Sequence, residues 1–214
     1  SVAFDLLLKS KLLERFFPEF VALLGVETIQ GKSHKDNFYH TTQVLDNVCN
    51  LSDSLWLRWA AILHDIAKPV TKRFEPNHGW TFHGHEDRGS RMVKKIFRRL
   101  RLPLDEKMRY VEKLVAMHLR PIVLSKEHVT DSAVRRLIVE AGEDIDDLMI
   151  LCRCDITSKN KHKVARHIEN LKVVEAKIKE VREKDELRNW QPILTGNHII
   201  QRFKIDNPKY IGEI

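Results

Sequence analysis

Apolar side chains recur at intervals of three and four residues along most of this chain, whereas strict alternation of apolar and polar residues is scarce. The first spacing places side chains on one face of an α-helix, and the second is typical of a strand. The pattern therefore predicts an all-α fold in which no strand is needed.

The predicted helices are bounded by residues that commonly begin or end helices. Pro18 and Gly142 stand at two expected ends, and Ser54 and either Thr130 or Asp131 stand at expected starts, where they can accept hydrogen bonds from free backbone N–H groups. The predicted helices cover residues 2–17, a short turn within 18–37, the segment marked by Phe38, Thr41, Val44, Leu45 and Val48, and then 54–67, 86–100, 105–120, 131–141, 144–158 and 161–189.

The longest predicted loop covers residues 68–84, where Pro and Gly recur. It leaves the end of the helix predicted over 54–67, and long loops in compact domains often carry function. The highly charged helix over 161–189 has an apolar stripe that is expected to pack on the core or on a neighbouring domain. Beyond it, residues 196–203 have the pattern of a short helix, and both ends of the chain look like cuts through a longer protein.

Composition and charge narrow the class of protein. The 214 residues are 43% hydrophobic, which suits one substantial core with a short C-terminal appendage. The apolar stretches reach roughly ten residues, against about 20 for a membrane-spanning helix, and no export signal is found. Three cysteines, an odd number, favour a reduced, cytoplasmic protein. A net charge of +7 is compatible with RNA or a nucleotide as partner but does not require one.

The pair His64-Asp65 closes an apolar helical run. An imidazole and a carboxylate at such a place lose hydration, and they persist mainly when they are paired or bind a metal. His40, His118 and Asp155 stand at comparable places on other predicted helices. Together these residues predict a metal site assembled from distant segments.

The residue types in this set indicate the chemistry. Nitrogen and oxygen ligands without a thiolate suit Mn, Fe, Co, Ni, Zn or Mg and do not select among them. A second ion would need further histidines, for which His85 and His118 are available. Such an ion lowers the pKa of a bound water to about 7 and polarises a phosphoryl oxygen. Lys68, Lys72 and Arg73 follow the His-Asp pair and are candidates to hold a substrate phosphate.

Each of these residues also has an ordinary interpretation when it is taken alone. His40 could be a surface or core histidine of its helix, and Asp155 a polar residue near a helix end. His118 could be a C-terminal cation favoured by the helix dipole. The basic residues of the loop over 68–84 would then be solvated charges.

Four segments carry a resemblance to a known family. His40, His64-Asp65 and Asp155 occur in the order found in the HD superfamily of metal-dependent phosphohydrolases, and the resemblance covers about residues 36–160. The surrounding residues resemble the HD region of bacterial tRNA nucleotidyltransferases (CCA-adding enzymes) and poly(A) polymerase relatives. The matching segments are Asp36–Asp46, Leu63–Pro69, Phe82–Glu86 and Cys154–Asn160.

The resemblance implies a division of the chain and roles for single residues. An HD-domain helical bundle over 36–160 would follow a helical lead-in over 1–35 and precede the long helix and C-terminal appendage over 161–214. One or two divalent ions would be held by six side chains, with a shared carboxylate bridging the two ions. The six are His40, His64, Asp65 and Asp155 for the first ion, with Asp65 shared, and His85 and His118 for the second.

Two further roles follow from the resemblance. Lys68 would contact the substrate phosphate or protonate the leaving oxygen, acting with Asp65 as the catalytic residues. Glu86 would orient the ring of His85 from outside the ligand set, a support that metal-bound imidazoles commonly have. His83 is the alternative to His85 as a ligand.

The function implied is that of an enzyme. Relatives of this region are associated with phosphodiesterase activity toward 2',3'-cyclic nucleotides and with 2'-nucleotidase and phosphatase activity, so the expected substrate is a nucleotide or RNA 3'-end phosphate, with tRNA as a candidate partner. The Gly-Ser and paired-aspartate motif of nucleotide addition is absent from these residues, and this chain alone is not expected to add CCA. The alternative is a non-catalytic HD module that positions tRNA for a missing nucleotidyltransferase head. The complete ligand set favours the enzyme.

Overall fold

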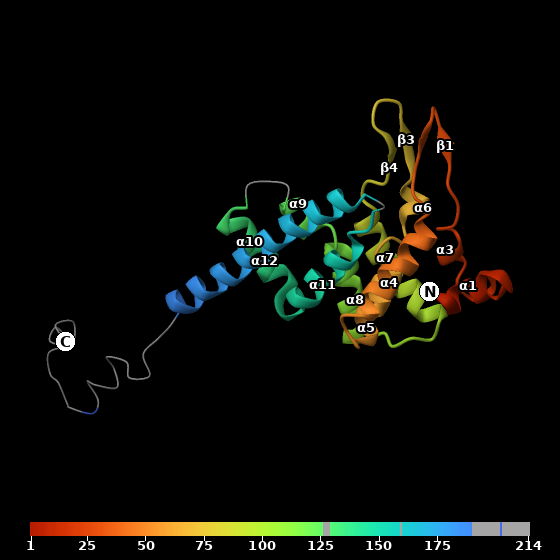
Figure 1. Ribbon diagram of the computed structural model, residues 1–214. Helices are drawn as coiled ribbons and strands as arrows, with labels where there is room; N and C mark the ends of the chain where they lie inside the picture. Colours follow the sequence, from red (N-terminus) through yellow and green to blue (C-terminus); the bar gives the residue numbers. More distant parts are fainter. Residues whose placement is uncertain (126–128, 159, 190–201, 203–214) are drawn as a thin grey trace. The chain divides into compact units, whose positions relative to one another are not determined.

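The computed structural model describes residues 1–125, 129–158, 160–189 and 202. Its first compact unit, Ser1–Ile178, is built almost entirely from helices (Figure 1). The second unit, Lys179–Ile214, contains in its described part the end of the last helix. The predicted all-α fold is confirmed.

The described elements alternate long helices with short turns of helix and two small hairpins. In chain order they are α1 (Val2–Lys9), α2 (Leu12–Phe16), α3 (Pro18–Val21), β1 (Thr28–Ile29), β2 (Lys32–Ser33), α4 (Asn37–Cys49), α5 (Leu55–Leu63), α6 (Lys68–Thr71), β3 (Arg73–Glu75), β4 (Gly79–Thr81), α7 (His85–Arg99), α8 (Glu106–Met117), α9 (Arg120–Leu124), α10 (Asp131–Ala141), a 3₁₀ turn (Gly142–Asp144), α11 (Ile145–Asp155) and α12 (Lys161–Asn189).

The centre of the first unit is a bundle of α4, α5, α7, α8 and α11 (Figure 1). Side chains on their facing sides are fully buried, among them Val44, Leu57, Ile96, Leu114 and Leu151. Burying one such side chain contributes about 1.5–3 kcal/mol, so hydrophobic contact fixes the relative positions of these helices. The polar residues at their ends are thereby held in place as well.

Two short antiparallel hairpins correct the prediction that no strand is needed. In the first, β1 and β2 are joined by Gln30 and Gly31, whose φ angles are 51° and 71°. Positive φ at both turn residues is the geometry that a two-residue hairpin turn favours. In the second, Arg73 of β3 pairs with Thr81 of β4. Strands of two or three residues are too short to show a period of two in the sequence.

The two hairpins lie beside each other. Lys32 Nζ donates hydrogen bonds to the backbone oxygens of Pro76 (3.1 Å) and Asn77 (3.0 Å). The indole N–H of Trp80 donates to the backbone oxygen of Lys32 at 3.0 Å. These contacts join β2 to the loop and strand of the second hairpin, which occupies most of the loop predicted over residues 68–84.

Several helix bounds differ from the prediction. The helix expected over residues 2–17 is interrupted because Lys11 has a left-handed backbone with φ 60°. The helix expected over 54–67 ends at Leu63, so that His64 and Asp65 lie in the turn that follows. The segment expected as a helix over 144–158 ends at Asp155 and is preceded by the 3₁₀ turn. The bounds predicted for α10 and α12 agree with the structure, and Thr130 caps α10.

The long helix α12 buries part of its predicted apolar stripe. Leu171, Val174 and Ile178 are buried within the first unit. No helix in the described part of the chain combines the length and the apolar character that a bilayer crossing requires. The short helix predicted over residues 196–203 lies outside the described residues, apart from position 202.

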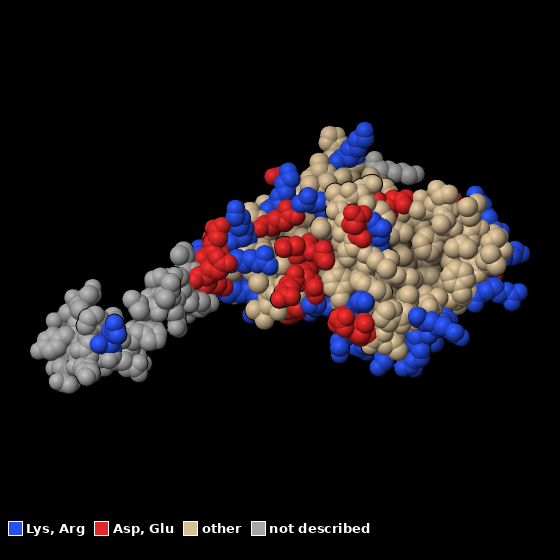
Figure 2. Space-filling view, turned by 90° about the horizontal axis from the view of Figure 1, so that it is seen from below, with Lys and Arg blue, Asp and Glu red and all other residues tan. Residues whose placement is uncertain are grey.

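Charged side chains on the face shown in Figure 2 are divided into small groups. Lys and Arg side chains are separated there by uncharged surface and by Asp and Glu. The net charge of +7 therefore does not form one continuous basic patch on this face. Any anion-binding site must be argued from local groups of residues.

Candidate metal centre

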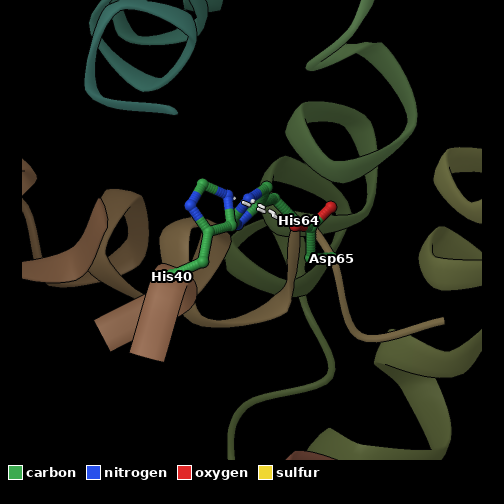
Figure 3. Close-up of side chains that lie close together, drawn as sticks. All are labelled: His40, His64 and Asp65. Atoms are coloured by element: carbon green, nitrogen blue, oxygen red, sulfur yellow. Dashed lines mark ion pairs between the residues drawn. The ribbon is translucent and has the colours of Figure 1, made fainter. Parts of the chain in front are cut away.

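The site begins where α5 ends. Ser54 accepts a hydrogen bond from Leu57 N and caps the start of α5, and the helix stops at Leu63. His64 and Asp65 follow in a turn and are buried. Figure 3 shows His40 reaching from α4 toward this pair. The apolar run that packs α5 into the bundle thus delivers two polar side chains to its centre.

One oxygen of the Asp65 carboxylate faces a first group of donors. Asp65 Oδ2 lies 3.4 Å from His40 Nε2 and 3.3 Å from His64 Nε2. The carboxylate of Asp155 joins them, because its Oδ1 lies 2.9 Å from His40 Nε2 and 3.5 Å from His64 Nε2. These four side chains come from α4, the turn after α5 and the end of α11.

The other oxygen of Asp65 faces a second group. Asp65 Oδ1 lies 3.2 Å from His85 Nε2 and 4.0 Å from His118 Nε2. The two imidazoles are themselves 3.3 Å apart at their Nε2 atoms. His85 begins α7 and His118 follows α8, so the second group is built from the two helices on the other side of Asp65. The structure brings together all six residues that the sequence suggested as ligands.

All four histidines turn the same nitrogen toward the centre. The Nδ1 atoms of His64, His85 and His118 lie 2.7–2.8 Å from backbone oxygens, and each of these oxygens belongs to the residue three positions earlier. His40 differs, because its Nδ1 lies 2.8 Å from the hydroxyl oxygen of Thr157. An outer hydrogen bond of this kind fixes the ring orientation and leaves Nε2 for a metal.

Two observations show that a divalent metal fits these donors. Several separations between facing donor atoms are 3.3–3.5 Å, longer than the roughly 2.9–3.0 Å typical of an N–H···O hydrogen bond and within the range expected between ligands of one ion with bonds of about 2.1 Å. His64 Nε2 is buried and has no hydrogen-bond partner among the described residues. Buried polar atoms are rarely left unpaired, and an ion between the donors would satisfy this one.

The charges of the first group support the same interpretation. Burial alone would lower the pKa of His64, but the Asp65 and Asp155 carboxylates raise it to about 10. Burial would raise the pKa of Asp65, yet the charges of His64 and Lys68 hold it well below its usual range. The pKa of Asp155 is likewise low, because the facing imidazoles of His40 and His64 outweigh its burial. In the metal-free protein the protonated His64 imidazole and the Lys68 ammonium balance these two carboxylates, and a metal ion that replaced the His64 proton would supply the same positive charge.

In the second group the pKa of one histidine shifts in the opposite direction. Burial lowers the pKa of His118 to about 4, and the positive charge of His64 acts in the same direction. A neutral imidazole is the form that binds a metal. His118 is therefore ready to act as a ligand at neutral pH.

Two local features of the sequence help to position the candidate ligands: a helix cap at Asp36 and a glycine at position 89. Asp36 accepts hydrogen bonds from Phe38 N (3.0 Å) and Tyr39 N (3.2 Å) and thereby fixes the first turn of α4, which carries His40. Gly89 of α7 leaves room for α8, since a Cβ at this position would lie 3.2 Å from Val115 Cγ1. This close approach sets the distance between the helices that carry His85 and His118.

A cleft of about 500 Å³ opens beside the first group, and we refer to it as the metal-side cleft. His40 and Asp155 line it together with Lys35, Lys68 and Phe82. Lys68 Nζ lies 2.6 Å from Asp65 Oδ2 and 5.6 Å from the centre of the Phe82 ring. A phosphate in this cleft would meet lysines next to the proposed ligands.

Four residues singled out in the sequence do not lie where their expected roles would place them. Lys72 pairs with the Glu27 carboxylate at 2.5 Å and does not line the metal-side cleft. Arg73 and His83 are exposed and line a different cleft. Glu86 lies 3.6 Å from His85 Nδ1, but the shorter contact of that nitrogen, 2.7 Å, is to the backbone oxygen of Phe82.

Sequence reasoning did not find Lys35 and Thr157. Lys35 Nζ donates to the backbone oxygen of Thr157 at 2.5 Å, and the Thr157 hydroxyl meets His40 Nδ1. Thr157 follows Asp155 by two positions, so one short segment supplies a candidate ligand and supports another. The contact joins residues 122 positions apart, and only the identity of Thr157 as a hydroxyl residue near Asp155 could have hinted at it.

Comparison with known proteins finds similarity over the part of the chain that contains the six candidate ligands. The sequence model described as HD domain matches residues 37–160. A multifunctional CCA protein of Shewanella frigidimarina is 38% identical over 106 residues, which are 48% of this chain and 24% of that protein. An A-adding tRNA nucleotidyltransferase of Deinococcus radiodurans is 32% identical over 147 residues, 67% of this chain and 32% of that protein. The chain thus spans about a quarter to a third of the length of these relatives.

Removing one imidazole at the centre should abolish tight metal binding. Second-sphere changes cost about 10- to 100-fold in metal affinity, so His64→Ala, which removes a donor itself, should weaken Mn²⁺ or Co²⁺ binding at least about 100-fold. Elemental analysis and calorimetric titration measure this. His162→Ala, which removes an exposed histidine from α12, is the control and should bind normally. Equal metal binding by both variants would exclude His64 as a ligand.

The Thr157 hydroxyl should matter for the metal through His40. Thr157→Val keeps the side-chain shape but removes the hydroxyl, and we expect metal affinity to fall about 10- to 100-fold. Thr157→Ser keeps the hydroxyl and should retain most of the affinity. If the two variants bind metal equally, the contact between Thr157 and His40 has no supporting role.

Metal binding should release a proton. In the metal-free protein the pKa of His64 is raised to about 10, so this imidazole is protonated at neutral pH and must lose its proton to bind an ion. The apparent affinity should therefore rise with pH, by up to about tenfold per unit for one proton, and level off near the raised pKa. Calorimetry at pH 7 and 8 in buffers of different ionisation enthalpy counts the protons. A pH-independent affinity would contradict the prediction.

Proposed function

The chain belongs to the HD domain family, and we propose that it is a divalent-metal phosphohydrolase acting on phosphate esters of nucleotides or RNA 3' ends. The observation that carries the proposal is the position of Asp65, whose two carboxylate oxygens each face a separate set of imidazoles. This arrangement suits one ion or two ions that share the carboxylate. His40, His64, Asp65 and Asp155 would hold the first ion, and His85 and His118 would complete the site of the second with Asp65.

Ions bound at such a site would lower the pKa of a water and polarise a phosphoryl oxygen. In hydrolysis the water oxygen bonds to phosphorus and releases one proton to solvent, the ester P–O bond breaks, and the leaving oxygen takes up a proton. We assign the proton donation to Lys68, because its ammonium group lies beside Asp65 on the wall of the metal-side cleft. The hydrogen bond from Lys68 to Asp65 also orients the carboxylate.

The metal-side cleft fits a phosphate bearing a small organic group. Its lining includes lysine, histidine and asparagine side chains and one carboxylate, that of Asp155. Among the residues that the structure describes, Lys35 Nζ donates hydrogen bonds only to the backbone and hydroxyl oxygens of Thr157 and pairs with no carboxylate, so its charge is available to an anion. A cleft of about 500 Å³ is within the size range of small-molecule sites.

The relatives suggest which phosphate esters to test. Two of the proteins that match this chain are named multifunctional CCA protein and A-adding tRNA nucleotidyltransferase, and the second name gives tRNA as the molecule acted on. On this basis we propose 2',3'-cyclic phosphates of nucleotides and RNA ends as the preferred substrates. Mn, Fe, Co, Ni, Zn and Mg remain the metals to compare.

The protein loaded with Mn²⁺, Co²⁺ or Ni²⁺ should hydrolyse bis-p-nitrophenyl phosphate and 2',3'-cAMP. Asp65→Asn should lower kcat at least about 100-fold, since it alters the carboxylate shared by both donor groups. Lys68→Ala should lower kcat for 2',3'-cAMP about 100-fold while the metal content stays unchanged, because its ribose leaving oxygen needs a general acid, whereas hydrolysis of bis-p-nitrophenyl phosphate should fall less because p-nitrophenolate leaves without a proton. Steady-state kinetics with elemental analysis of each variant checks this.

Lys94→Ala, which removes an exposed lysine from α7, is the control and should be as active as the unmodified protein. A metal-loaded protein that hydrolyses neither substrate but shifts tRNA in a gel would overturn the proposal. That result would favour a non-catalytic module that positions tRNA.

A further inference from the structure

A second cleft, of about 590 Å³, is lined by arginines from two different elements, and we refer to it as the arginine cleft. Arg73 comes from β3, and Arg88 and Arg91 lie one turn apart on α7. His83 lines the same cleft. None of these residues belongs to the cluster around Asp65.

The carboxylates of the arginine cleft are already engaged. Asp87 pairs with Arg91 at 2.6 Å, and Glu75 accepts a hydrogen bond from the hydroxyl of Thr81 at 3.2 Å. In contrast, the guanidinium groups of Arg73 and Arg88 form no hydrogen bond or ion pair with any residue that the structure describes. Two unpaired guanidinium groups therefore share one concave surface.

This combination favours a phosphate group as ligand. A guanidinium presents paired N–H donors that match two oxygens of a phosphate, and it keeps its charge at any physiological pH. Arginines from two elements can hold one anion from two directions. A concave site also exposes that anion less to solvent screening than a flat surface would.

The arginine cleft and the metal-side cleft share a wall. Phe82 lines the metal-side cleft and His85 belongs to the metal cluster, whereas His83 and Gly84 between them line the arginine cleft. The short helix α6 has the same property, since Lys68 lines one cleft and Thr71 the other. Neighbouring residues of the same two segments therefore line both clefts.

We propose that the arginine cleft binds an internal phosphodiester of an RNA strand whose 3'-terminal phosphate occupies the metal-side cleft, with Arg73 and Arg88 as its ligands. The proposal rests on the proposed function. A mononucleotide has no phosphodiester to place in a second site, whereas a strand continues beyond its terminal nucleotide. The substrate class is therefore an RNA end rather than a free nucleotide.

The test compares a small substrate with an RNA substrate. The double variant Arg73→Ala/Arg88→Ala should hydrolyse bis-p-nitrophenyl phosphate with unchanged kcat and KM, because this compound has one phosphate, which occupies the metal-side cleft, and no second phosphate for the arginine cleft. For a short RNA ending in a 2',3'-cyclic phosphate, KM should rise about 10-fold or more through the loss of charge-assisted hydrogen bonds. The matched control is Lys94→Ala/Arg98→Ala, which removes two exposed positive charges from α7 outside the arginine cleft.

Salt dependence gives a second readout that needs no catalysis. Fluorescence anisotropy with a labelled DNA strand ending in a 3'-phosphate measures binding directly. Each lost phosphate contact should reduce the slope of log affinity against log salt concentration by about 0.7. The double variant should show this reduction, and the control should not.

The outcomes separate the two proposals. If the unmodified protein hydrolyses no phosphate ester, the proposed function fails, and the anisotropy slopes still decide whether Arg73 and Arg88 bind a strand. If hydrolysis is observed but the double variant equals the control on RNA in both KM and slope, the arginine cleft is not a strand site. Equal losses on both substrates would indicate a structural defect and would also overturn the proposal.

Discussion

The buried carboxylate of Asp65 is the constraint on which the rest of the structure depends. An ionised carboxylate in a protein interior costs several kcal/mol unless cations or donors surround it. Here every oxygen of the group faces an imidazole or an ammonium: Oδ2 faces His40, His64 and Lys68, and Oδ1 faces His85 and His118. Helices that are far apart in the sequence must meet at this point. Their apolar packing keeps the donor side chains at fixed distances from Asp65.

The fold and the donor set were largely predictable because both leave local signals. A period of three to four residues marks α4, α5, α10 and α12, and polar ligands stand out at the ends of apolar runs. The hairpins left no such signal, since each strand has only two or three residues and is stabilised by contacts such as that between Trp80 and Lys32. The contact of the Thr157 hydroxyl with His40 also has no local signal in the sequence, because the two residues are 117 positions apart.

Proximity in sequence proved a poor guide to the residues around the centre. Lys68, Lys72 and Arg73 were grouped because they follow the His-Asp pair, but α6 and β3 turn the chain so that only Lys68 lines the metal-side cleft. Lys72 is held by Glu27 instead. Lys35, which precedes α4 and lies far from the pair in sequence, lines that cleft. The four-residue helix α6 therefore suffices to place Lys68 in the metal-side cleft and Arg73 in the arginine cleft.

The two donor groups differ in the number of side chains they offer, and this difference suggests different roles for the ions they would hold. The first group offers four donors, His40, His64, Asp65 and Asp155, whereas the second offers His85 and His118 with the shared Asp65. Four protein donors can complete a tetrahedral shell, while three leave a position for water or substrate, as in catalytic sites. Because both groups include the Asp65 carboxylate, an ion in one would change the charge felt by an ion in the other. The geometry would in this way couple a more closed set to a more open one, and replacing Asp65 would alter both sets.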